Sequence, residues 1–300
     1  MSGVLLCEPN VSEGRDPERL DAFAAAVRAT PGVRLIHRSA DPDHHRMVLA
    51  YLGRPDDVVE ATRRLALEVF RRIDLRVHRG GHPRAGALDV VPFVALGGLP
   101  EEEAFEACRS FGEWVGERGV PVYFYERSAT TPGRRALPAV RAGGFEALEA
   151  RMKDPRWRPD AGPVAVHPTA GAVITGVRGL LVRFNVNLAT PDPEPAREIA
   201  REIRESGGGL ANLRALGFAL PSRSLTQVSM NLTDYRRTSL GDAYAAVRER
   251  ARARGVVIAG VEVIGPVPPE ALREAPADIL DALDDGQVLP EGACADRRTT

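Results

Sequence analysis

The sequence predicts an α+β protein made of two similar subdomains, each a sheet with helices on its outer face. Three observations lead to this prediction. Apolar residues recur with strand and helix periods that alternate along the chain. The order strand, helix, strand, strand, helix, strand occurs in both halves of the 300 residues. That order is typical of a split βαβ, or ferredoxin-like, unit with a mixed sheet, one face of which carries no helix.

Each half supplies its elements in turn. In the first half, strands are expected at residues 4–11, 33–39, 47–53, 88–96 and 120–126. Helices are expected from Pro17, which follows the capping residue Asp16, from about Asp56 to Ile73, across Phe105 to Val115, and over 137–152. In the second half, strands are expected at 179–189, 212–220, 225–233 and 256–265, and helices at 195–206 and 240–254.

A stretch rich in proline and glycine, residues 156–176, marks the boundary between the halves. We therefore expect an N-terminal subdomain over 1–177 and a C-terminal subdomain over 178–280. From Asp281 the apolar pattern is lost, which predicts a flexible tail over 281–300. Two sheets with bare faces can cover each other, so a cleft or tunnel is expected where they meet.

Composition excludes several classes of protein. With 40 basic and 41 acidic residues the net charge is −1, which argues against a nucleic-acid or membrane-surface partner. The cysteines Cys7, Cys108 and Cys294 have neither disulfide nor metal-ligand spacing. The N-terminus is polar too soon for a signal peptide, and no apolar run reaches the roughly 18 residues of a membrane span. These features predict a cytoplasmic protein. Phosphate-loop, dinucleotide-binding and serine-hydrolase motifs are missing from the sequence.

The segment from Val77 to Phe93, VHRGGHPRAGALDVVPF, places polar and flexible residues directly before an apolar strand. His78 and His82 have the spacing of helical metal ligands, but the intervening glycines and Pro83 disfavour a helix, so no metal is expected. His82 is instead expected on a loop edge where a ligand can approach. A loop histidine bonded to a backbone carbonyl is the alternative; Arg84, two residues on, favours a site that binds an anion.

Further polar residues occur where strands end or alternate with apolar positions. They are Asn10, Ser12 and Glu13; Asp41, Asp43, His44, His45 and Arg46; Asn185 and Asn187; and Ser229 and Asn231. A solvated sheet face accounts for the alternating ones. If the two sheets face each other, the same amides point into a cleft, where they can both donate and accept hydrogen bonds to a small ligand.

Several motifs in order resemble the glutamate formimidoyltransferase family, folate-dependent enzymes of histidine breakdown. They are CEPNVSEGR, HRGGHPRAGALDVVPF, RRALPAVRAGGFEAL, FNVNL and QVSMNL, and the likeness extends to about residue 275. The chain resembles the transferase unit alone, without the helical cyclodeaminase portion of the vertebrate bifunctional relatives.

This resemblance implies two ferredoxin-like subdomains with a folate-binding tunnel between them, in a homodimer. It implies transfer of a formimidoyl group from N-formimidoyl-L-glutamate to N5 of tetrahydrofolate, a co-substrate, without a metal. The catalytic histidine of the family corresponds to His82. Its folate-contacting segment corresponds to Pro163, Val164, Ala165, Val166, His167, Pro168, Thr169, Ala170, Gly171 and Ala172.

Three departures from the family pattern stand out. The usual HKGEHPRMGALDV is HRGGHPRAGALDV here, so a lysine, a glutamate and a methionine become Arg79, Gly81 and Ala85. The PSWG of the animal enzymes is PTAG, which places Ala170 where a tryptophan stood. In place of an animal-type DVDAGPSTNR the chain has RSADPDHHR. The first two changes bear on the charge beside His82 and on the stacking of folate.

The roles expected for other residues are hypotheses. His82, with an ordinary pKa near 6.5, is suited to general acid and base catalysis. Asp41 or Asp43 is a candidate for contact with the cationic amidine, and Arg46, Arg84 or Arg183 for the carboxylates. Asn10, Asn185, Asn187 and Asn231 complete the candidate substrate-binding set. Two alternatives remain open: a related folate enzyme that uses formyl-glutamate or 5-formyltetrahydrofolate, and a non-catalytic folate-binding protein.

Overall fold

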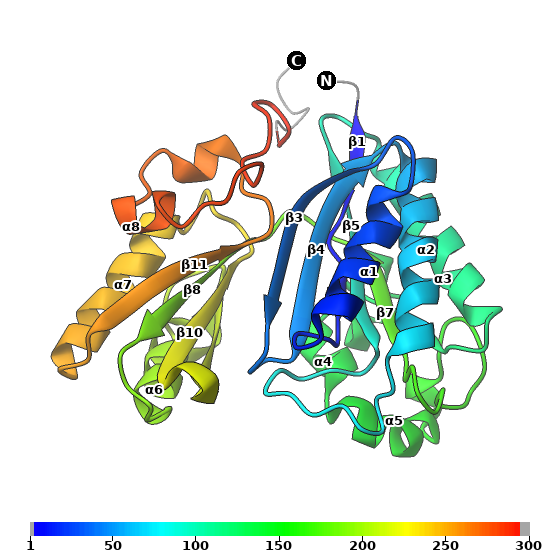
Figure 1. The fold of residues 1–300 in the computed structure, drawn as a ribbon, viewed down its shortest axis with the longest axis horizontal. Helices are drawn as coiled ribbons and strands as arrows, with labels where there is room; N and C mark the ends of the chain where they lie inside the picture. Colours follow the sequence, from blue (N-terminus) through cyan, green and yellow to red (C-terminus); the bar gives the residue numbers. More distant parts are fainter. Residues whose placement is uncertain (1–2, 295–300) are drawn as a thin grey trace. The chain divides into compact units, whose positions relative to one another are not determined.

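The structure, a computed structural model, describes residues 3–294 (Figure 1). The chain forms two compact units, which are described separately below. One runs to Arg178 and includes the chain from Gly292, and the other is Gly179–Glu291. The former is called the N-terminal unit and the latter the C-terminal unit. Within 3–294, none of the helices is both long enough and apolar enough to cross a bilayer.

The N-terminal unit is built on a seven-stranded mixed sheet in the order β1-β4-β2-β5-β7-β6, with β3 also paired to β4. The strands are β1 Val4–Cys7, β2 Asn10–Val11, β3 Arg34–Asp41, β4 Arg46–Gly53, β5 Leu88–Leu96, β6 Val122–Phe124 and β7 Val173–Val177. The expected first strand is interrupted at Glu8 and Pro9, and both of its parts, β1 and β2, pair antiparallel with β4 and β5. β7 runs parallel to β5 and β6.

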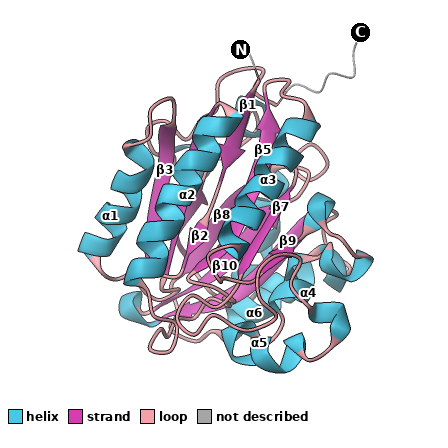
Figure 2. Cartoon of the chain, turned by 90° about the vertical axis from the view of Figure 1, so that its right-hand side faces the viewer, coloured by secondary structure: helices cyan, strands magenta, loops and turns pink. Residues whose placement is uncertain are grey.

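Three helices cover one face of this sheet (Figure 2). They are α1 Pro17–Arg28, α2 Pro55–Arg72 and α3 Glu101–Gly116. The predicted start of α1 is confirmed: the Asp16 carboxylate accepts hydrogen bonds from the backbone N–H groups of Glu18 and Arg19, and Pro17 is the first helical residue. Apolar side chains of the three helices share one buried core with β1, β4 and β5. This core anchors β5 immediately after the loop that carries His82.

The segment after β6 differs from the prediction. It contains three short 3₁₀ turns, at Glu126–Ser128, Pro132–Arg134 and Pro155–Trp157, and two helices, α4 Leu137–Arg141 and α5 Gly144–Met152. The single helix expected over 137–152 is wrong, because Gly143 and Gly144 have φ values of 78° and 64°. This left-handed backbone ends one helix and starts another. Strand β7 was not predicted either, since its short apolar run lies in the stretch read as a boundary.

The C-terminal unit has a four-stranded sheet in the order β11-β8-β10-β9, with every neighbouring pair antiparallel. Its elements are β8 Val182–Leu188, α6 Glu194–Ile203, β9 Leu213–Leu220, β10 Leu225–Leu232, α7 Leu240–Ala253 and β11 Ile258–Ile264. Short turns at Glu205–Gly207, Pro221–Arg223 and Pro269–Leu272 and helix α8 Ala277–Leu280 complete it. The elements follow the predicted chain order. Phe184 and Val186 on β8 pack with α6 and α7 in one core, so the alternating Asn185 and Asn187 lie on the opposite face of the sheet.

The flexible tail expected over 281–300 is wrong for its described part. The buried Gln287 side chain donates hydrogen bonds to the carbonyl oxygens of Val263 (3.0 Å) and Gly265 (2.9 Å). Val267 and Leu289 pair through their backbones. Ala293 is buried, and its carbonyl accepts a hydrogen bond from Gly97 N–H. Polar side-chain and backbone bonds hold this segment without a periodic apolar pattern. Residues 295–300 lie outside the described part of the chain.

Candidate functional site

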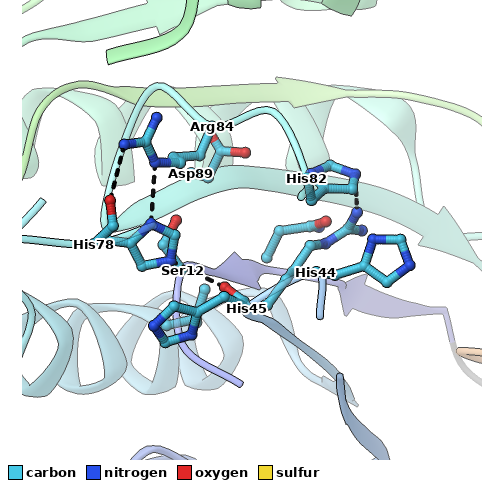
Figure 3. Close-up of a pocket in the computed structure, with 10 residues that line it drawn as sticks. Ser12, His44, His45, His78, His82, Arg84 and Asp89 are labelled. Atoms are coloured by element: carbon cyan, nitrogen blue, oxygen red, sulfur yellow. Dashed lines mark hydrogen bonds between the residues drawn. The ribbon is translucent and has the colours of Figure 1, made fainter. Parts of the chain in front are cut away.

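A pocket of about 190 Å³ in the N-terminal unit brings together residues from four separate segments (Figure 3). Its lining residues are Asn10, Val11, Ser12, His44, His45, Arg46, His78, His82, Arg84 and Asp89. Most of these were singled out from the sequence as polar residues beside strand ends. Antiparallel pairing of β2 with both β4 and β5 explains why segments so distant along the chain meet at one place.

The loop that carries His82 lies against the turn between β3 and β4. Gly81 N–H donates to the carbonyl of Asp43 (2.9 Å), and His82 N–H donates to the carbonyl of His44 (3.4 Å). The turn itself is held by Asp41, whose Oδ1 accepts from the backbone N–H groups of Asp43 (2.9 Å) and His44 (2.7 Å). The printed contacts of Asp41 and of the Asp43 carbonyl are thus bonds that shape the loop and the turn.

The hydrogen bonds of the His82 ring identify its tautomer. Nδ1 lies 2.8 Å from the carbonyl oxygen of Pro83, which can only accept, so Nδ1 carries the hydrogen. Nε2 contacts Nη1 of Arg46, which can only donate, so Nε2 is the acceptor. Burial, and then the nearby charges of Arg46 and Arg141, lower the pKa of His82 well below its usual 6.5. At neutral pH the ring is uncharged, with a basic Nε2 at the pocket.

Asp89, at the start of β5, fixes the chain that leaves His82. Its Oδ1 accepts hydrogen bonds from the backbone N–H groups of Ala85 (2.7 Å) and Gly86 (3.3 Å). Its Oδ2 forms an ion pair with Arg141 of α4 at 2.8 Å, and both side chains are largely buried. Ser12 Oγ donates to the Gly86 carbonyl (2.7 Å) from the opposite side. The backbone of this segment is therefore held at several points.

Arg84, a candidate for binding a substrate carboxylate, is bound within the protein instead. Its guanidinium donates to both carboxylate oxygens of Glu146, at 2.9 and 2.7 Å. Its Nε donates to Nδ1 of His78 (3.1 Å; Figure 3). The bonds from Arg84 lower the pKa of Glu146 to about 2. Arg84 thus joins α5 to the loop that carries His82, which gives it a structural role in this state of the protein.

A stacked pair of histidines forms the floor of the pocket. The rings of His45 and His78 lie 4.2 Å apart and nearly parallel, and His78 Nε2 donates to the His45 carbonyl (3.0 Å). His45 Nδ1 accepts from Gly14 N–H (3.1 Å), near the Glu13 carboxylate. Burial, and then the adjacent His78, lower the pKa of His45 to about 4. Like His82, the stacked histidines are uncharged near neutral pH.

Sequence reasoning missed Arg141 and Glu146 as part of this site. Both lie in the segment RAGGFEAL, which the resemblance quoted without a role for its charged residues. The split between α4 and α5 lets Arg141 reach Asp89 while Glu146 reaches Arg84. The Gly-Gly pair between the two charges is the local signal for a turn. Their partners are far away in sequence, and no local pattern identifies them.

The segment Pro163–Ala172, expected to contact folate, has an exposed beginning and a buried end. Pro163, Val164 and Ala165 are exposed, whereas Ala170 and Ala172 are buried. The Ala170 carbonyl accepts from Ala87 N–H (2.9 Å), so this end is tied to the chain that follows His82. The Ala170 side chain belongs to the hydrophobic core. A larger aromatic residue at this position would meet packed core atoms, so the absence of a tryptophan here removes no ligand-facing surface.

Four of the predicted substrate-binding residues, Arg183, Asn185, Asn187 and Asn231, belong to the C-terminal unit. Asn187 Nδ2 donates to Glu262 Oε1 (2.8 Å), and Asn185 Nδ2 lies 3.4 Å from the other oxygen of that carboxylate. Arg183 Nε donates weakly to the carbonyl of Ile264 (3.4 Å), and Asn231 lies opposite Arg183 in the register of β8 and β10. These residues therefore form a polar patch around Glu262, which sequence reasoning missed.

Two adjacent glycines of the loop allow a matched test of its fit. A Cβ at Gly80 would lie 2.4 Å from the His44 carbonyl oxygen, whereas at Gly81 the nearest atom, the Asp43 carbonyl oxygen, is 3.3 Å away. We expect Gly80→Ala to displace the loop and lower kcat/KM by about tenfold or more. Gly81→Ala should change the free energy of unfolding by about 1 kcal/mol or less. Steady-state kinetics and urea unfolding of both variants test this, and equal effects would contradict it.

Among residues 3–294, no group of His, Cys, Asp and Glu side chains is arranged to hold a metal ion. The chemistry available to the pocket is that of neutral imidazoles, guanidinium groups and amides. Such groups can accept and return a proton and can bind a carboxylate.

Comparison with known proteins matches both units to one family. A model for the N-terminal subdomain of the formiminotransferase domain matches residues 4–178, and a model for the formiminotransferase domain matches residues 183–282. The glutamate formimidoyltransferase of Streptococcus pyogenes serotype M1 is 39% identical, over 95% of each chain. That of Thermoplasma acidophilum is 38% identical, over 94% of this chain and 95% of its own.

Longer relatives match as well. The formimidoyltransferase-cyclodeaminase of Sus scrofa is 40% identical over 92% of this chain. The match covers 52% of that protein, so the chain spans about half the length of this relative.

Proposed function

The chain belongs to the formiminotransferase family, and from this premise we propose that it transfers a formimidoyl group from N-formimidoyl-L-glutamate to N5 of tetrahydrofolate. His82 serves as the general acid and base. The observation that supports this role is the tautomer of His82: its Nε2 carries a lone pair at a polar pocket, and the ring is uncharged at neutral pH. The sequence identity to the glutamate formimidoyltransferases of two prokaryotes supports the substrates.

The proposed reaction needs one proton to move twice. N5 of tetrahydrofolate attacks the amidine carbon of the donor, forms a C–N bond and transfers its proton to His82 Nε2. As the bond from that carbon to the glutamate nitrogen breaks, His82 returns the proton to the departing nitrogen. The products are 5-formimidoyltetrahydrofolate and L-glutamate. General acid–base help of this kind contributes about 10²- to 10⁴-fold in rate, and holding both substrates together contributes further.

Two features keep His82 suited to both transfers. The bond from Nδ1 to the Pro83 carbonyl fixes the tautomer, and it can also stabilise the imidazolium formed midway, since that bond persists on protonation. The ion pair of Asp89 with Arg141 and its bonds to Ala85 and Gly86 hold the loop in place. The ring therefore has little to reorganise during the reaction.

Several further roles belong to this proposal. Folate binds along Pro163–Ala172, of which the exposed residues at the beginning offer the accessible surface. Asn10 and Arg46, which line the pocket with His82, contact the donor. Residues 1–177 and 178–280 act as two ferredoxin-like subdomains of a cytoplasmic homodimer. Asp41 and Asp43 contribute through the turn that supports His82.

A direct assay tests the function. Purified protein is mixed with tetrahydrofolate and either N-formimidoyl-L-glutamate or N-formyl-L-glutamate, and the 5-substituted folate is followed by absorbance and mass spectrometry. We expect turnover with the formimidoyl donor and at least about tenfold less with the formyl donor. Turnover with only the formyl donor would support the related folate enzyme instead. Binding of folate with no turnover on either donor would support a non-catalytic protein.

A further inference from the structure

The atom that must act as the base is already engaged in the structure. His82 Nε2 accepts a hydrogen bond from Nη1 of Arg46, the first residue of β4. Since Nδ1 donates to the Pro83 carbonyl, Nε2 holds the only lone pair that the neutral ring can offer to a proton. Nε2 cannot take a proton from a substrate while it points at a guanidinium donor. Arg46 must release it before the chemistry begins.

The arginines around His82 differ in the groups that they bind. Arg141 is paired with the Asp89 carboxylate at 2.8 Å, and Arg84 with both oxygens of Glu146. These are strong, charge-assisted contacts within the protein. Arg46, by contrast, donates to a neutral imidazole, which is a weaker acceptor than a carboxylate. A ligand carboxylate that enters the pocket therefore competes better for Arg46 than for Arg84 or Arg141.

We propose that Arg46 is a positioning residue that a carboxylate of the donor draws away from His82, so that the base is released only when the donor is bound. The inference rests on the proposed function, because it takes the donor to be an N-substituted glutamate with two carboxylates. It adds a role for this residue that contact with substrate alone does not give. In the empty site Arg46 holds Nε2, and in the occupied site it holds the ligand.

The charged groups around the ring predict what this exchange does to it. His82 faces Arg46 from β4, Arg141 from α4 and His44 from the turn before β4, and each lowers its pKa in addition to burial. Arg141 stays paired with Asp89 of β5, so Arg46 is the cation that can leave. Neutralising Arg46 with a carboxylate favours the protonated ring, and the pKa of His82 then rises toward its usual 6.5. A higher pKa makes His82 a better base near neutral pH.

Nuclear magnetic resonance measures the exchange without turnover. The pKa of His82 is read from its imidazole ¹⁵N and ¹H shifts, with no ligand, with saturating L-glutamate, and with the neutral diamide of glutamate. We expect L-glutamate to raise the pKa of His82 by about one unit in the natural protein, and the diamide to leave it unchanged. In Arg46→Gln the pKa should already be raised without ligand, and L-glutamate should add no further shift.

A second variant and a control make the result decisive. Arg46→Lys keeps the charge but loses bidentate binding, so it should keep the low pKa of His82 and bind L-glutamate at least about tenfold more weakly. Arg109→Gln, on the exposed surface of α3, should behave like the natural protein. The proposal is overturned if Arg46→Gln leaves the pKa of His82 unchanged, or if L-glutamate shifts it equally with and without Arg46. Failure of the turnover assay alone would overturn the proposed function and leave the measured exchange standing.

Discussion

Replacing His82 with alanine should leave the chain folded and folate bound while turnover falls by at least about 100-fold. The substitution removes the one group whose lone pair is placed to take the N5 proton and return it to the leaving nitrogen. His82 is only partly buried and lies on a loop, so its loss opens no large cavity in the core. Circular dichroism, binding of tetrahydrofolate by calorimetry and steady-state turnover measure the three expectations separately.

A second substitution separates proton transfer from the contact with Arg46. The carboxamide oxygen of His82→Gln can still accept a hydrogen bond from Arg46, but it cannot carry a proton at neutral pH. If His82 acts as acid and base, His82→Gln should be as slow as His82→Ala. Turnover within about threefold of normal in either variant would refute the assignment. Recovery in the glutamine variant alone would mean that the residue matters for holding Arg46 and not for moving protons.

The elements that sequence patterns predicted well are those whose signals are local. The start of α1 was correct because capping by Asp16 and a first-turn Pro17 depend on neighbouring residues. The range of β5, Leu88–Leu96, was also correct, because a long apolar run after glycine and proline marks a buried strand. His82 was placed on a loop at the edge of that strand for the same local reason, and it does line a pocket there.

The errors arose where long-range contacts decide the structure. β7 is short, and it becomes a strand because β5 and β6 pair with it on either side. Residues 281–291 stay ordered through the bonds of Gln287 to the chain that follows β11, which leave no periodic apolar pattern. In the site, Arg84 was expected to bind substrate, since no local signal shows that Glu146, a distant residue, occupies it. Sequence therefore identified the members of the site better than it identified their partners.

One of those partners supports the second large effect that we expect. Asp89→Asn should lower the free energy of unfolding by about 3 kcal/mol, because it leaves the buried guanidinium of Arg141 without its carboxylate. The asparagine oxygen can still accept from Ala85 N–H, but its amide group would face another donor. A shift of the segment that follows His82 should also lower turnover by about tenfold or more. Urea unfolding and steady-state kinetics measure the two effects.

The control for Asp89→Asn is a carboxylate bound by arginine in an exposed place. Glu106 pairs with Arg109 on the surface of α3, where both side chains are more than half exposed, so Glu106→Gln should cost less than about 1 kcal/mol. Removing both charges of the buried pair, with Asp89→Asn and Arg141→Met together, should restore part of the lost stability, because no buried charge then lacks a partner. Activity should stay low in this double variant, since the backbone of the loop is still held less firmly. If Asp89→Asn proves no more costly than Glu106→Gln, the buried ion pair does not hold the loop, and the position of His82 must depend on the turn at Asp41 instead.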